Sequence, residues 1–150
     1  MVQLKIYKKF QQQPKHLIPK LAKLLHASFN SGQDYSSFKI DALNHYETND
    51  FCFYLILKST IISYLTIRIC GQKAELWNFC THPKFRSQGY GSLLFDLCRL
   101  TIKTAIPNLN KIELMVLNTN YLAHKFYQRL GFKKTGKNKS LEAIIMSLDI

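Results

Sequence analysis

Seven residues with the sequence RSQGYGS, residues 86–92, have the composition of a phosphate-binding loop. They follow a predicted strand and open a predicted helix, so several backbone N–H groups at the helix start have no intrahelical partner. Those amides and the helix dipole attract an anion such as a pyrophosphate, and Arg86 adds a positive charge. Gly89 and Gly91 let the backbone approach a ligand, although a tight strand-to-helix turn would need the same glycines.

Two familiar phosphate-binding motifs do not fit this loop. The ATPase loop requires Gly-Lys-Ser or Gly-Lys-Thr, and neither tripeptide occurs in the chain. The dinucleotide fingerprint requires a third glycine where this chain has Leu94. The anion expected here therefore belongs to neither an ATPase nor a Rossmann-type site.

A second motif, NYLAHKFYQRLGF, occupies residues 120–132. Together with Thr81-His82-Pro83 and the Arg-x-x-Gly-x-Gly pattern of residues 86–91, it resembles the coenzyme A motifs of the Gcn5-related N-acetyltransferase (GNAT) family. The two motifs occur in the family's order, on a predicted strand–loop–helix and a predicted strand–helix. The resemblance covers nearly the whole chain and implies the fold and the activity of that family.

The resemblance implies that acetyl-CoA lies in a V between two splayed parallel strands, residues 74–80 and 111–117. Backbone groups near Phe79 and Thr81 would bind the pantetheine arm as a neighbouring strand would, and Asn120 would hydrogen-bond it. The residues expected to bind acetyl-CoA are Phe79, Thr81, Arg86, Ser87, Gln88, Gly89, Tyr90, Gly91, Ser92 and Asn120. No metal is expected, because the cysteines and histidines show no ligand spacing.

Glu75 is the first candidate for the catalytic base. An alkyl amine with a pKa of about 10 is protonated at pH 7 and must lose a proton before it attacks. Several histone-type members of the family place a glutamate at this point of the strand, and alternation predicts that Glu75 faces the cleft together with Trp77 and Phe79. An exposed strand carboxylate without a chemical role, or deprotonation through water, remains open, and His82 is a weaker candidate.

Tyr127 is expected, by the resemblance, to point its phenol at the thioester sulfur. A core aromatic at helical spacing is the alternative. Full proton transfer from a phenol of pKa about 10 to a thiolate of pKa about 8.5 costs about 2 kcal/mol. We therefore expect a hydrogen bond with partial transfer, and a backbone N–H near residues 79–81 as the donor to the oxyanion.

The elements that must position these residues follow from hydrophobic periodicity. The predicted order is β-α-α-β-β-β-α-β-α-(β)-β, with residues 133–139 as a basic turn and the last strand over 141–148. This order predicts an α/β (α+β) fold with a mixed, mostly antiparallel twisted sheet, flanked by helices and splayed between the fourth and fifth strands. The 150 residues are expected to form one domain, 1–150.

The formal net charge of +12 favours anionic partners. Four of the nine acids, Asp34, Asp41, Glu47 and Asp50, lie in one segment, which we interpret as an acidic mouth for a cationic acceptor; ordinary surface acids are the alternative. The basic N-terminal region and the turn at 133–139 suggest docking on an acidic protein or nucleic acid, although solvated surface is the default interpretation and sequence-specific nucleic-acid recognition is not favoured.

The sequence therefore predicts an acetyl-CoA-dependent N-acetyltransferase that acts on a primary amine of a small cationic molecule, peptide or protein, by direct attack in a ternary complex. Members that acetylate ribosomal N-termini carry a glutamate where this chain has Met115, so that activity is less favoured. A non-catalytic acetyl-CoA- or nucleic-acid-binding module is the alternative. Scattered cysteines, expected to be buried and reduced, and the lack of a membrane segment predict a cytoplasmic monomer or homodimer.

Overall fold

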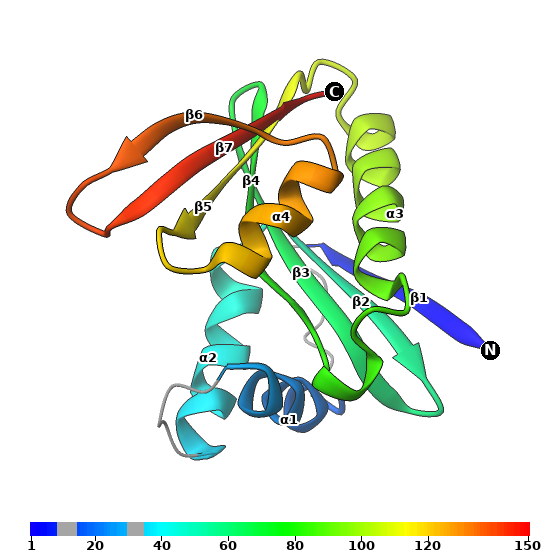
Figure 1. The fold of residues 1–150 in the computed structure, drawn as a ribbon. Coiled ribbons are helices and arrows are strands. Elements are labelled where there is room, and N and C mark those ends of the chain that lie inside the picture. The colour runs from blue at the N-terminus through cyan, green and yellow to red at the C-terminus, as the bar shows by residue number, and fades with distance from the viewer. Residues whose placement is uncertain (9–14, 30–34) are drawn as a thin grey trace.

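The computed structural model describes residues 1–8, 15–29 and 35–150 (Figure 1). A short 3-10 helix, η1 (Pro83–Phe85), lies between β4 and α3. The other elements, in chain order, are β1 (Val2–Lys8), α1 (Ile18–Ser28), α2 (Tyr35–Thr48), β2 (Phe51–Leu57), β3 (Thr60–Cys70), β4 (Lys73–Thr81), α3 (Tyr90–Ala105), β5 (Lys111–Leu117), α4 (Tyr121–Arg129), β6 (Lys133–Asn138) and β7 (Ala143–Asp149).

The strands form one sheet with the order β1-β2-β3-β4-β5-β7-β6. Every neighbouring pair is antiparallel except β4 and β5, which run parallel. This arrangement confirms the predicted mixed, mostly antiparallel α/β fold. Among the described residues, no helix is long and apolar enough to cross a membrane.

Helices cover both faces of the sheet. This explains why β2 is apolar at every position. Phe53 and Leu55 face a core that also contains residues of α3 and α4. Cys52 and Tyr54 face a second core beneath α1 and α2. Successive side chains of a strand point to opposite faces, so a strand covered on both sides becomes a continuous hydrophobic run.

The sheet is splayed between β4 and β5, as the resemblance implied. The two strands pair only at their starts, where Lys73–Glu75 lie opposite Lys111–Glu113. Beyond these residues β4 continues to Thr81 and β5 to Leu117, but the two strands no longer pair with each other. In Figure 1, β5, β7 and β6 diverge from β4 beside α4. The unpaired stretch leaves backbone groups of β4 available to a ligand.

Two structural features differ from what the sequence predicted. Residues 133–138 form the edge strand β6 and pair with β7; the predicted order allowed a strand at this point, but these residues were interpreted as a basic turn. Lysines and a glycine give this segment a low strand propensity, but edge strands of natural sheets commonly carry lysine, which discourages further pairing. Cys70, expected to be buried, is exposed at the end of β3, whereas Cys52, Cys80 and Cys98 are buried.

Candidate active site

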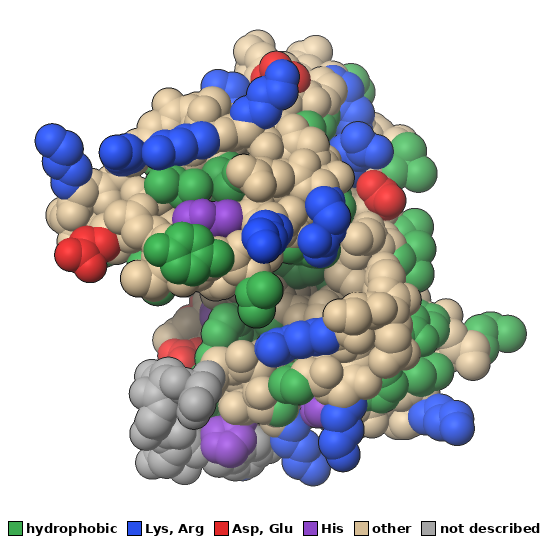
Figure 2. Space-filling view, in the orientation of Figure 1, with side chains coloured by type: hydrophobic (Ala, Val, Ile, Leu, Met, Phe, Trp, Pro, Cys, Tyr) green, Lys and Arg blue, Asp and Glu red, His purple; other side chains and the backbone are tan. Residues whose placement is uncertain are grey.

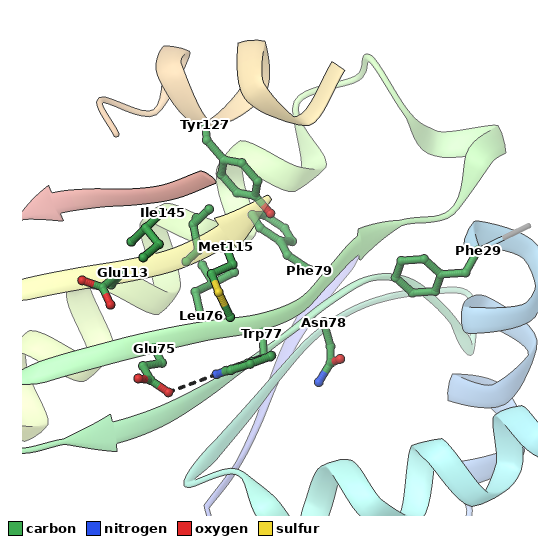
Figure 3. A pocket seen from close by; sticks show the side chains of 11 residues that line it. Phe29, Glu75, Leu76, Trp77, Asn78, Phe79, Glu113, Met115, Tyr127 and Ile145 are labelled. Carbon is green, nitrogen blue, oxygen red and sulfur yellow. Dashed lines mark hydrogen bonds between the residues drawn. The ribbon is translucent and has the colours of Figure 1, made fainter. Parts of the chain in front are cut away.

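A pocket of about 290 Å³ opens where β4 and β5 diverge (Figure 3). In the space-filling view the surface is hollowed between α4 and the side formed by α1 and α2 (Figure 2). Side chains from β4, β5, β7, α4 and the end of α1 meet in the pocket. The lining residues are Phe29, Glu75, Leu76, Trp77, Asn78, Phe79, Glu113, Leu114, Met115, Tyr127 and Ile145.

A β-bulge in β4 divides this lining between the two faces of the sheet. Asn78 has φ +55°, and the register shifts so that Tyr64 opposes Cys80 while Thr66 opposes Trp77. Asn78 Nδ2 donates to Thr66 Oγ1 at 3.0 Å, which fixes the bulge to β3. Because the extra residue resets the alternation, the prediction that Phe79 faces the same side as Glu75 is wrong.

Phe79 instead turns toward α4 and contacts the tyrosine expected to act on sulfur. Its ring centroid lies 5.4 Å from that of Phe126 and 6.1 Å from that of Tyr127. Tyr127 is buried, and a third ring, Phe132, packs on it at 5.7 Å. Burial raises the pKa of the Tyr127 phenol well above its ordinary value, so this group stays protonated at neutral pH.

Glu75 lies on the floor of the pocket within a hydrogen-bonded group. Lys73 Nζ lies 2.9 Å from Glu113 Oε1 and 3.3 Å from Glu75 Oε1. Trp77 Nε1 donates to the other Glu75 oxygen at 3.4 Å, and Ser147 Oγ donates to Glu113 Oε2 at 3.4 Å. The hydrogen bond to Glu113, together with the charges of both glutamates, raises the pKa of Lys73. Two carboxylates of the pocket lining, which we call the floor, are therefore ion-paired with one ammonium, that of Lys73.

Sequence reasoning assigned no site role to Glu113, because the residue is distant in sequence from Glu75. The parallel register places these two glutamates directly opposite each other. Phe29 and Ile145 were missed as well, since their approach to the pocket depends on how α1 and β7 pack. Side-chain alternation along β5 does predict that Glu113 shares a face of the cleft with Met115, but it does not predict the pairing with Glu75.

The loop before α3 has the backbone expected of an anion site. Ser87 and Gly89 adopt positive φ values of +59° and +84°. Gly89 is the N-cap of α3, and no described side chain caps this helix. A Cβ on Gly89 would meet no described atom within 4 Å, so the space beside the helix start is open. The first N–H groups of α3 thus have no side-chain acceptor among the described residues, and the positive end of the helix dipole favours an anion there.

Gly91 is needed for packing within the protein rather than for space beside a ligand. A Cβ at this position would lie 3.2 Å from Phe126 Cζ and 3.3 Å from Thr81 Oγ1. The glycine therefore lets the first turn of α3 approach both α4 and the end of β4. It joins the two predicted motifs in space, which explains why both carry small or aromatic residues at these points.

Other predicted binding residues also hold the loop in place. Arg86 Nε donates to the carbonyl of Thr81 at 3.0 Å, and its guanidinium reaches the carbonyl of Ser28 at 3.4 Å. Gln88 donates to the carbonyl of Lys84 at 3.1 Å. Because these bonds use backbone carbonyls, they tie the loop to β4 and α1 while the loop amides stay available. Tyr90 and Ser92 lie in the first turn of α3 and are half-buried.

Asn120 and His82 both act as local caps. Asn120 is the N-cap of α4, and its Oδ1 accepts from the N–H of Ala123 at 3.2 Å, which leaves the side-chain NH₂ as a donor. His82 Nδ1 accepts from the N–H of Lys84 at 3.2 Å at the start of η1. Partial burial, with Lys84 and Arg86 nearby, lowers the pKa of His82. His82 is not among the residues that line the pocket.

The acidic segment that we interpreted as a mouth for the acceptor contains one aspartate with a structural hydrogen bond. Asp50 Oδ2 accepts from the N–H of Ile69 at 2.7 Å and so joins the start of β2 to β3. None of the described acids of this segment lines the pocket, whose carboxylates come from β4 and β5. Asp34 lies outside the described residues.

Solved structures similar to this one include two described as N-acetyltransferases. The PaiA N-acetyltransferase from Thermoplasma acidophilum, in complex with coenzyme A, superposes with a TM-score of 0.80 over 99% of both chains at 19% identity. The ribosomal-protein-S18-alanine N-acetyltransferase from Escherichia coli gives 0.73, over 99% of this chain and 94% of that one, at 19% identity. Ard1 from Thermoplasma volcanium gives 0.68, over 98% and 97%, at 20% identity.

A match between the sequence and a family model identifies the family of this chain. Residues 18–132 match the model of the acetyltransferase (GNAT) family, so the chain belongs to that family, as the two motifs predicted. Acetyl-CoA is the cosubstrate of this family. No curated protein matches the sequence significantly.

Proposed function

We propose that the protein transfers the acetyl group of acetyl-CoA directly to a primary amine within a ternary complex. The observation that carries this proposal is one pocket that contains both a buried phenol, Tyr127, and a carboxylate, Glu75, where the sheet diverges. Tyr127 belongs to the side of the sheet covered by α3 and α4, and Glu75 to the opposite side. The two groups can thus act on opposite sides of the acetyl carbon, Glu75 on the attacking amine and Tyr127 on the departing sulfur.

The residues around the α3 start suit acetyl-CoA. The amides of residues 87–92 would hold its pyrophosphate, because the positive φ of Ser87 and Gly89 turns the loop and no described atom fills the space at Gly89. The unpaired edge of β4 at Phe79 and Thr81 would hold the pantetheine, with the amide of Asn120 as a further donor. When bound, acetyl-CoA supplies an activated acyl group as a thioester.

Glu75 would remove the proton that the acceptor ammonium must lose. An alkylammonium with a pKa of about 10 gives up its proton at neutral pH only with the help of a nearby base. The Glu75 carboxylate is ion-paired with Lys73 and lines the pocket, so it can accept this proton directly or through one water. The backbone N–H groups of residues 79–81 are the proposed donors to the oxyanion.

Tyr127 would stabilise the departing thiolate by a hydrogen bond. Since burial raises the pKa of its phenol, complete proton transfer to a thiolate is even less favourable than for an ordinary tyrosine. A hydrogen bond that shortens as negative charge develops on sulfur does not require that transfer. A route through an acetylated cysteine is not supported, because burial raises the pKa of Cys80 to about 12 and keeps its thiol protonated.

The test is release of free coenzyme A thiol from acetyl-CoA with a panel of amines. Amine-dependent release is the expected result. Binding of coenzyme A by calorimetry without release over the whole panel would instead favour a non-catalytic binding module.

Glu75→Gln examines the base in the same assay. We expect kcat/KM to fall about 100-fold and the acidic limb of its pH profile to move, because the carboxylate no longer titrates as the base. Glu142→Gln, an exposed glutamate outside the pocket, is the matched control. A pH profile that does not change in Glu75→Gln would assign proton removal to a water relay.

A further inference from the structure

The wall of the pocket is apolar and partly exposed. Phe29, Trp77 and Met115 are 41%, 39% and 40% exposed, and they come from three separate elements: the end of α1, β4 and β5. Ile145 of β7 lies beside Met115 in register. Figure 3 shows these side chains around the same space as Tyr127 and Glu75. A pocket lined by accessible apolar side chains beside a few polar groups is typical of a binding site for an apolar group.

The floor of the same pocket carries a small net charge. Two carboxylates, Glu75 and Glu113, lie on either side of the Lys73 ammonium, so the group has one net negative charge. Arg68 lies over the Trp77 ring at 5.8 Å and adds a positive charge on the rim. Ser147, which donates to Glu113, is itself in hydrogen-bond contact with Thr135 at 3.0 Å. This floor can balance one ammonium, and within residues 1–8, 15–29 and 35–150 no third carboxylate lines the pocket.

We propose, on the basis of the function above, that the acceptor is a small primary monoamine with an apolar body, such as an alkylamine or arylalkylamine. Its ammonium would bind at Glu75 and Glu113, and its body would cover Phe29, Trp77 and Met115. Polyamines and aminoglycosides fit poorly, because they would bring additional charges against apolar walls and near Lys73 and Arg68. A peptide fits poorly too, because most of the lining above the floor is apolar and offers few partners to further amide groups.

An alkylamine series measures the apolar contribution. From butylamine to pentylamine to hexylamine, kcat/KM should rise about threefold to fourfold per methylene, as expected for burial of a CH₂ group. Phenethylamine should be a good substrate. Spermidine, kanamycin and a short peptide amide that begins with methionine should be poor ones. Preference for any of these last three over hexylamine would overturn the proposal.

Met115→Gln tests the wall without a large change in side-chain length. The KM for hexylamine should rise about fivefold to tenfold while the KM for acetyl-CoA stays the same, because only the apolar contact is lost. Leu100→Gln places the same polar group on an exposed leucine of α3 outside the pocket and serves as the control. Equal effects of the two variants would contradict the assignment of Met115 to the acceptor.

Lys73→Met tests the charge count on the floor. Removing the ammonium leaves two carboxylates, so the ratio of kcat/KM for 1,6-diaminohexane to that for hexylamine should rise about threefold to tenfold. Lys5→Met on β1 should leave the ratio as it is. An unchanged ratio in Lys73→Met would show that the floor does not discriminate between acceptors by their charge.

A binding measurement separates this proposal from the proposed function. Trp77 is the only tryptophan of the chain, so tryptophan fluorescence, excited selectively over the tyrosines, reports on the pocket. Phenethylamine titrated into the complex with coenzyme A should change the emission saturably, and spermidine at the same concentration should not. A saturable change without acetyl transfer would retain the acceptor site and reject the proposed function. Acetyl transfer to some other amine, without any effect of phenethylamine on the emission, would retain the proposed function and reject the acceptor site.

Discussion

Two helices begin beside the cleft, and their starts are built differently. α4 begins at Asn120, whose side chain accepts from the N–H of Ala123. α3 begins at Gly89, which has no side chain to cap the helix, and no other described residue replaces it. A side chain of the protein therefore caps one N–H of α4, whereas the first N–H groups of α3 are those that we propose for an external anion.

The lengths and packing of the helices explain why this difference is tolerated. α3 has 16 residues and buries Leu94, Phe95, Cys98 and Ile102, so tertiary contacts stabilise it without a cap. α4 has nine residues and buries only Tyr127. A short helix with little buried surface needs its cap to keep its one buried residue in place. We therefore interpret the uncapped start of α3 as a binding site for an anion, and the capped start of α4 as a device that positions Tyr127.

The largest expected effect comes from giving the open start a negative charge. Gly89→Asp should weaken the binding of coenzyme A at least about 100-fold, because the carboxylate would repel the phosphates and occupy the N–H groups. Calorimetry with coenzyme A measures this change. Gly71→Asp is a matched control, since Gly71 also has a positive φ of +63° and no described atom near its Cβ position, but lies in the β3–β4 turn. Equal affinity of Gly89→Asp and the wild type would place the phosphates elsewhere.

A smaller effect, on rate alone, is expected from the residue that α4 positions. Tyr127→Phe should lower kcat by one to two orders of magnitude and leave the affinity for acetyl-CoA nearly unchanged, because only the hydrogen bond to the leaving thiolate is lost. Steady-state thiol release and calorimetry together separate the two parameters. Tyr121→Phe, on the exposed side of the same helix, should have no effect. A normal kcat in Tyr127→Phe would remove this phenol from the mechanism.

The smallest effect should be on stability. Asn120→Ala removes the cap of α4 and should lower the free energy of unfolding by about 1 kcal/mol, which corresponds to about 2–4 °C in Tm for a chain of this size. Asn120→Asp keeps an oxygen acceptor and should restore most of this loss. Thermal unfolding followed by circular dichroism is the measurement. If both variants unfold like the wild type, the comparison between the two helix starts does not hold for α4.

The candidate site was predicted from sequence where the evidence lies in short segments. Residues 86–92 and 120–132 each carry their pattern within one turn and one helix, so Gly89 and Tyr127 could be assigned without a structure. The side to which Phe79 points could not be predicted. It depends on a bulge at Asn78, whose bonding partner, Thr66, belongs to another strand.

The sequence by itself determined the order of the elements, the splayed sheet implied by the family motifs, and the family. These follow from periodicity and from local motifs, which need no knowledge of distant neighbours. Only the tertiary structure decided the surroundings of the proposed acceptor site: Phe29 and Trp77 in the lining of one pocket, and Lys73 paired with two glutamates from different strands. Such contacts join residues that are far apart along the chain, and they come from strand register and helix packing, which no single segment encodes.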